Sequence, residues 1–120
     1  MTAKKIKDIN REISRLRAKM ARISAEADNI SPKLSDIPGG CGTSDKLGNA
    51  VAQIADIQRE IQNLEILRNS ALNRLSRDDF VENCLFMHLS LRYSWAKIAV
   101  DTGGINTPDN IRIMCNRHHW

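Results

Sequence analysis

The chain has 120 residues, a formal net charge of +4 and the composition of an ordinary folded protein, with 42% hydrophobic and 27% charged residues. Aromatic residues make up only 4%, and glycine and proline gather mainly at 32–42 and 103–108, which excludes a β-sandwich or barrel. No apolar run approaches the roughly 18–20 residues of a membrane span. Three cysteines without a CxxC pair argue against a disulfide framework and a zinc ribbon, so we expect a cytoplasmic protein.

Residues 3–30 predict one long helix with a coiled-coil seam. Apolar side chains recur at alternating spacings of three and four residues over four heptads, and the residues between them are mostly polar or charged. A helix of this kind must pack its apolar stripe against a partner. The seam consists of Ile6, Ile9, Ile13, Leu16, Met20, Ile23, Ala27 and Ile30.

Residues 31–44 are expected to interrupt the helix, because they contain Pro32, Pro38 and a glycine pair. Ser44 is the predicted N-cap of a second helix. An antiparallel hairpin over 1–75 is the simplest arrangement, although each seam could instead pair with another chain. A two-helix core is thin, so we expect a homodimer through the apolar edge left over. The second seam consists of Leu47, Val51, Ile54, Ile57, Ile61, Leu64, Leu67, Ala71 and Leu75.

Residues 76–120 contain all five aromatic residues and predict three short helices. The first starts near 76–79 and runs to about 91. Ser94 caps the second, over 95–102, which Gly103 and Gly104 end. Thr107 caps the third, with Pro108 at its first position, and that helix is expected to run to the chain end. Its buried stripe would be Ile111, Met114 or Cys115, and His118, while Trp95 and His88 are expected to be core or partly buried residues of the earlier helices.

The predicted fold is therefore all-α, with a long antiparallel helical hairpin or coiled coil at 1–75 followed by a three-helix helix-turn-helix at 76–120. In a helix-turn-helix the second helix of the pair lies in the major groove of DNA.

Three segments resemble a phage and prophage family described as sigma-factor-like or ArpU-type transcriptional regulators of Gram-positive bacteria. Residues 93–99 read YSWAKIA, residues 106–112 read NTPDNIR, and residues 43–51 read TSDKLGNAV. The similarity covers most of 40–117. It implies a fold like region 4 of a sigma factor and a transcriptional regulator that binds double-stranded DNA. The hairpin is expected to contact RNA polymerase or another host protein as a further partner.

Seven residues are candidate DNA contacts, and none is a candidate catalytic group. Asn110 has the side chain that bonds bidentately to adenine, or it is a second capping residue. Arg112 is suited to guanine or phosphate, and Arg117 to phosphate. A solvated surface is the alternative for every member of the set, which is Lys97, Thr107, Asn110, Arg112, Ile113, Asn116 and Arg117.

The charge distribution keeps a second interpretation open. Residues 1–35 hold nine basic and four acidic residues, whereas residues 76–120 hold five of each. A neutral C-terminal section favours a phage-encoded coiled-coil protein that binds a host protein, with a degenerate helix-turn-helix. We expect no enzyme activity, no cofactor and no metal site, since Cys115 and His119 alone do not complete a zinc site.

Overall fold

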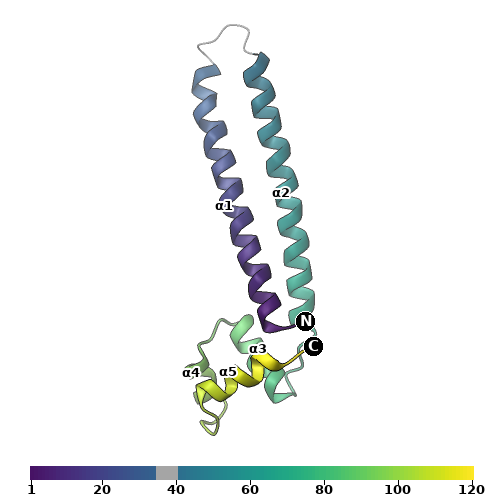
Figure 1. Cartoon of the computed structure of the whole chain (residues 1–120), viewed down its shortest axis with the longest axis vertical. Coiled ribbons are helices and arrows are strands. Elements are labelled where there is room, and N and C mark those ends of the chain that lie inside the picture. The colour runs from purple at the N-terminus through teal and green to yellow at the C-terminus, as the bar shows by residue number, and fades with distance from the viewer. Residues whose placement is uncertain (35–40) are drawn as a thin grey trace. The chain divides into compact units, whose positions relative to one another are not determined.

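The computed structural model describes residues 1–34 and 41–120, and the side chains of 1–27 and 47–120. The described residues form helices joined by turns and no strand, which confirms the all-α fold class. The helices are α1 (Ala3–Leu34), α2 (Cys41–Asn73), α3 (Phe80–Leu89), α4 (Trp95–Asp101) and α5 (Pro108–Arg117) (Figure 1). No helix in the described part is both long and apolar enough to cross a membrane.

Helix α1 ends later in the sequence and helix α2 begins earlier than we predicted, so fewer residues separate them. Helix α1 continues to Leu34, past Pro32, because a proline removes only its own N–H and a helix can continue beyond one lost hydrogen bond. Helix α2 begins at Cys41, so Ser44 is not its N-cap. Serine occurs inside helices as well as at their starts, so a serine alone does not fix where a helix begins. The rest of the predicted loop, residues 35–40, lies outside the described residues.

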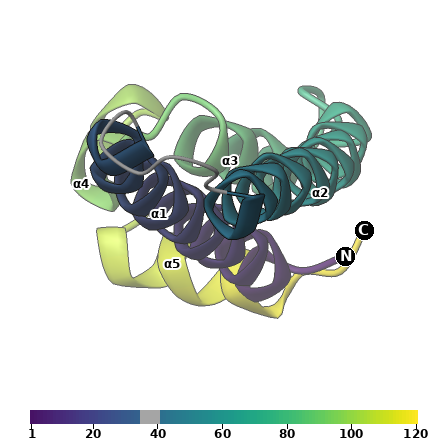
Figure 2. The same ribbon diagram turned by 90° about the horizontal axis from the view of Figure 1, so that it is seen from above.

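Packing divides the chain into two compact units. One contains residues 1–10 and 66–120, and the other contains residues 11–65. The long helices run antiparallel within each unit (Figures 1 and 2). The predicted division into 1–75 and 76–120 follows the order of the motifs along the chain, and it stays a prediction.

In the unit 11–65 the predicted seams of α1 and α2 meet. Ile13 and Leu16 of α1 and Ile57 and Ile61 of α2 are buried. Arg17 donates to Glu65 across the pair, with Nη2 2.6 Å from Oε1. The described seam residues closer to the masked loop, from Met20 to Ala27 on α1, are only half-buried.

The predicted seam of α2 is wrong at two positions. Val51 in the unit 11–65 is 67% exposed, and Leu67 in the other unit is 50% exposed. A 3.5-residue repeat drifts by about 20° per heptad around a straight helix, so over four heptads its ends rotate away from the partner. Leu72, which is outside the predicted seam, is buried instead.

The unit of residues 1–10 and 66–120 has one apolar core. Leu85 of α3, Ile98 of α4 and Ile111 of α5 are completely buried in it, together with Ile6 of α1. The other buried members are Ala3, Ala71, Leu72, Leu75, Cys84, Ala99 and Cys115. The three short helices therefore pack on each other and on the ends of α1 and α2.

Local caps set the limits of the three short helices. Asp79 accepts a hydrogen bond from the Glu82 N–H and begins α3. Ser94 and Thr107 begin α4 and α5 in the same way, which confirms both predicted caps. Gly103 and Gly104 have φ of +102° and +73° and donate to the carbonyls of Val100 and Ala99 in a Schellman motif.

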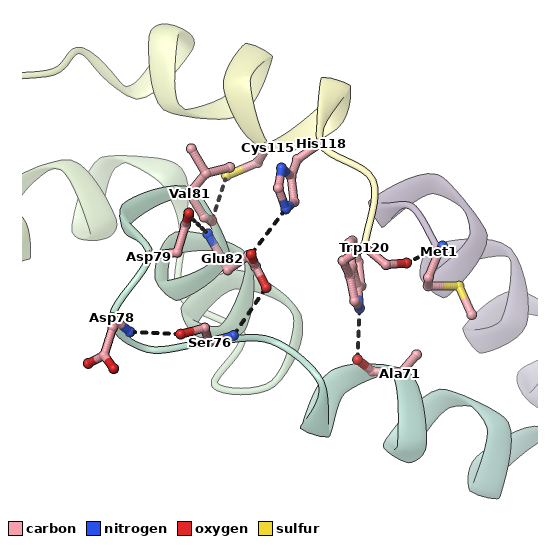
Figure 3. A network of polar contacts seen from close by, with 10 residues as sticks. All are labelled: Met1, Ala71, Ser76, Asp78, Asp79, Val81, Glu82, Cys115, His118 and Trp120. Carbon is pink, nitrogen blue, oxygen red and sulfur yellow. Dashed lines mark hydrogen bonds and ion pairs between the residues drawn. The ribbon is translucent and has the colours of Figure 1, made fainter.

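Helix α5 ends at Arg117, so the prediction that it runs to the chain end is wrong. His118 is already extended. Trp120 then donates from its indole Nε1 to the carbonyl of Ala71 over 2.7 Å and from its backbone N–H to the carbonyl of Met1 over 2.9 Å. These bonds draw the last residues away from the helical path (Figure 3).

The turn between α3 and α4 contains a strained residue. Arg92 has φ of +60°, a left-handed conformation that costs a non-glycine residue about 1 kcal/mol or more. We expect Arg92→Gly to raise the free energy of unfolding by about 1 kcal/mol. Arg92→Ala keeps the strain and removes only the charge, so it should give no such gain. Urea denaturation followed by circular dichroism measures both, and equal stabilities of the two variants would contradict the strain argument.

Candidate nucleic-acid interface

Helix α5 has one face in the core and one face in solvent. Ile111 and Cys115 are buried, and Met114 and His118 are half-buried, which confirms the predicted inner stripe. The Cys115 thiol lies 3.8 Å from the Val81 carbonyl of α3. Because these residues are buried in the core, α5 cannot rotate about its own axis without exposing them. The same side chains of its outer face therefore always point into solvent.

The seven candidate residues are all exposed. Helical spacing places Ile113 and Asn116 along the middle of the outer face of α5, with Arg112 on one side and Asn110 and Arg117 on the other. The structure thus brings five of the seven onto one helix face. Thr107 lies at the start of that helix, and Lys97 belongs to α4.

The start of α5 is tightly organised. The Thr107 hydroxyl accepts a hydrogen bond from the Asn110 N–H over 3.2 Å, so Thr107 is the N-cap and Asn110 supplies a backbone donor to it. Pro108 occupies the first helical position, where its missing N–H costs nothing. The exposed start of this helix carries the partial positive charge that favours an anion.

Sequence reasoning missed Asp109 as a member of this surface. Its side chain is 86% exposed, and its Oδ1 lies 3.7 Å from Nε of Arg112. By helical spacing it lies on the same outer line as Ile113 and Asn116. The signal was present in the sequence, because an acidic residue three positions before an arginine on a helix is a common ion pair. An exposed pair of this kind contributes little to stability, but it places a negative charge beside the main candidate base contact.

Lys97 is positioned by the turn that precedes α4. Its backbone N–H donates to the Ser94 hydroxyl over 3.2 Å, and its Nζ lies 4.4 Å from the centre of the Tyr93 ring. The ring restrains the ammonium group by a cation–π interaction while leaving it in solvent. This arrangement suits a contact to a phosphate group rather than to a base edge.

A stack of two side chains lies next to the turn that precedes α4. The His88 ring lies 3.7 Å from the Trp95 ring, nearly parallel to it, and His88 Nδ1 donates to the Tyr93 carbonyl over 2.9 Å. Lys7 of α1 lies 5.9 Å from the same indole ring. Trp95 and His88 are half-buried and serve packing, as expected from the sequence.

The end of α5 is held by a polar network (Figure 3). His118 Nε2 lies 3.4 Å from Glu82 Oε2, and Glu82 Oε1 accepts from the Ser76 N–H over 3.2 Å. His118 is thus placed beside one carboxylate of α3 and not within a metal-ligand cluster. Among the described residues, no group of three or more His, Cys, Asp and Glu side chains is arranged so that it could hold a metal ion.

No family model, curated protein or solved structure matches this chain.

Burial lowers the pKa of His88 below its usual value of about 6.5, and the Lys7 charge lowers it further, while the bond to the Tyr93 carbonyl opposes the shift. The unfolded chain therefore binds the proton more readily, and stability should fall as the pH drops below about 6.5. Urea denaturation between pH 7.5 and 5 should show a smaller decline for Lys7→Gln and for His88→Phe than for the wild type. Parallel curves for all three proteins would contradict this role of His88.

Burial also raises the pKa of the Cys115 thiol to about 12, with a contribution from Cys84, whose own pKa is raised by burial. The reactive thiolate is therefore nearly absent near neutral pH. In a Cys41→Ser variant, we expect both remaining thiols to react with Ellman's reagent at pH 8 at least about 100-fold slower than in urea. Fast labelling of the native variant would show that the α3–α5 contact opens readily.

Proposed function

We propose that the chain is a phage-type DNA-binding transcriptional regulator in the cytoplasm, with α4 and α5 as a helix-turn-helix and α5 as its reading helix. One observation carries the proposal. Helix α5 is fixed by a buried row, and its outer face presents exposed polar and basic side chains of the kinds that read bases and bind phosphates. The resemblance of residues 93–99 and 106–112 to sigma-like phage regulators supports the same assignment.

The side chains of α5 divide by the contacts that they are suited to make. Arg112 has the planar fork that bonds to the N7 and O6 acceptors of guanine, and Asn110 pairs in a similar way with adenine. Ile113 offers an apolar contact to a thymine methyl group, and Asn116 extends the polar row. Arg117, one turn further along than Ile113, is better placed for a phosphate.

Residues 76–120 have no net charge, but this sum does not give the charge at the outer face of α5. Asp79 caps α3, and Glu82 binds the Ser76 N–H, so these carboxylates serve the start of α3. Residues 95–117 contain three basic and two acidic residues, a net charge of +1. With so few cations the salt dependence of DNA binding should be shallow, because its slope follows the number of phosphates neutralised.

A second function is kept because of one specific observation. The Asp109 carboxylate beside Arg112 repels phosphate and competes for the guanidinium. This favours a coiled-coil interaction protein that binds RNA polymerase or another host protein, with a helix-turn-helix that only packs. The two functions differ in whether the outer face of α5 has any binding role. We propose no catalytic activity in either case.

The test is fluorescence anisotropy with duplexes selected from a random library, measured across a salt series. We expect Arg112→Ala to weaken specific binding by about 10- to 100-fold, since one good bidentate base contact is worth about 1–3 kcal/mol. Arg117→Ala should weaken specific and random duplexes alike and reduce the salt slope by about one. Circular dichroism should show unchanged helical content in both variants.

The matched control removes two positive charges from α1 in the double variant Lys19→Ala/Arg22→Ala. If α5 reads DNA, this control should keep its preference for the selected duplex. If the control abolishes binding while the α5 variants do not, only the basic first helix attracts the polyanion. Absence of any preferred duplex for the wild type would favour the protein-binding alternative.

A further inference from the structure

Two lysines from distant parts of the sequence lie at the turn that precedes α4. Lys97 of α4 has its Nζ 4.4 Å from the centre of the Tyr93 ring, and Lys7 of α1 has its Nζ 5.9 Å from the centre of the Trp95 ring. His88 joins the two aromatic residues, because its ring stacks on Trp95 and its Nδ1 bonds to the Tyr93 carbonyl. Both lysines therefore belong to one surface of the unit of residues 1–10 and 66–120.

Neither ammonium group is neutralised by a neighbouring carboxylate. Lys7 and Lys97 are exposed, and neither forms an ion pair with another residue that the structure describes. Asp101 lies at the far end of α4, whereas the Lys97 ammonium lies over a ring that precedes the helix. Asp8 projects about 100° away from Lys7 around α1. Aromatic rings restrain these cations without cancelling their charge, so the turn has a positive potential.

A third cation, Arg92, adjoins Tyr93 at a backbone position that suits glycine. Its φ is +60°, whereas after α4 the chain places Gly103 and Gly104 at the left-handed positions. Arg92 is exposed, and its side chain makes no hydrogen bond, ion pair or ring contact with another described residue. The strain therefore brings no contact within the described fold. Strain of this kind is found at functional sites, which points to a role for the guanidinium outside the chain.

We propose that Lys7, Arg92 and Lys97 form one site for phosphates of the DNA backbone, so that the first helix of the chain takes part in DNA binding. This inference rests on the proposed function, in which α4 and α5 form a helix-turn-helix. In such a motif the first helix crosses the DNA backbone while the second lies in the major groove. The turn before α4 is then next to the phosphates at the edge of that groove.

This site supplies cations that the helix-turn-helix by itself lacks. Residues 95–117 hold three basic and two acidic residues, and Lys7 and Arg92 raise the basic count of the surface to five. An ammonium group meets a phosphate as a point charge, and a guanidinium can bond to two of its oxygens. Three neutralised phosphates should contribute roughly −2.7 to the slope of log K against log salt concentration.

The first test measures fluorescence anisotropy of the library-selected duplex and of a random duplex with the full chain at pH 7.5. Lys7→Gln, Arg92→Ala and Lys97→Gln should each weaken both duplexes about 3- to 10-fold near 150 mM salt. Each should also reduce the salt slope by about one, and the triple variant should reduce it by about three. The preference for the selected duplex should stay within about twofold, because phosphate contacts carry no base information.

The matched control is Lys5→Gln, which removes the same charge from the same helix. Lys5 is exposed and lies about 200° from Lys7 around α1, so it is on the other side of the helix. Its affinity and salt slope should stay within about twofold and about 0.3 of the wild type. Lys7→Arg keeps the charge and should bind as the wild type does. Circular dichroism measures whether all variants keep their helical content.

Arg92 allows a sharper test, because stability and binding should change in opposite directions. Arg92→Gly relieves the strain and removes the guanidinium, so it should raise the free energy of unfolding and weaken both duplexes about 3- to 10-fold. Arg92→Ala should weaken binding equally without the gain in stability. Arg92→Lys keeps the charge and should bind as the wild type does. Wild-type binding by the glycine and alanine variants would overturn the place of Arg92 in the site.

The outcomes separate this inference from the proposed function. A wild type that prefers the selected duplex, with Lys7→Gln behaving as Lys5→Gln does, would overturn the role of the first helix and leave the proposed function intact. A wild type that binds all duplexes alike, and that the three variants weaken but Lys5→Gln does not, would support the phosphate site and overturn base reading by α5. No binding to any duplex near 50 mM salt would overturn both.

Discussion

The packing of Ile111 and Cys115 into the core of α3 and α4 is the constraint on which the candidate interface depends. A helix of ten residues is marginal in water by itself, so α5 owes its stability to this contact and to its cap. Ile111 is completely buried together with Leu85 and Ile98. Since the inner row cannot turn outward without exposing these side chains, the outer row is fixed as a set. Any function of α5 must therefore use the residues from Asp109 to Arg117 that face solvent.

Short-range signals in the sequence were accurate for the three short helices. The caps Ser94 and Thr107 and the Gly103–Gly104 pair act through hydrogen bonds to residues three to five positions away. Such bonds can be predicted from neighbouring residues in the sequence. Signals that depend on a partner were less accurate. The seam of α2 drifted from its partner at Val51 and Leu67, and the stack of His88 on Trp95 depends on how α3 and α4 meet in space. Asp109 was overlooked as part of this surface, although its position three residues before Arg112 is a sequence signal for an ion pair on a helix.

A count of charges along a segment is a poor guide to the field at a surface. The acidic residues near the start of α3 are engaged there: Asp79 receives a hydrogen bond from the Glu82 N–H, and Glu82 receives one from the Ser76 N–H. Lys97 and Arg112, by contrast, project into solvent, one above the Tyr93 ring and the other beside Asp109. The section 76–120 is neutral as a whole, yet two of its five acidic residues are engaged at the start of α3, and Asp109 lies beside Arg112. The placement of these groups, and not their sum, decides what the surface can attract.

The proposed DNA binding is limited by the small number of cations near α5. Each phosphate neutralised contributes a factor to the binding constant through counterion release, so affinity rises steeply with the number of contacts. One copy offers few such contacts, and Asp109 reduces their effect. If the chain forms the homodimer expected from its thin two-helix core, two copies on one duplex would double the contacts, because the second then binds at a high effective concentration. A weak dimer is sufficient for this, since binding to a shared duplex itself favours association. A regulator of this design would respond to its own concentration more steeply than a monomer does.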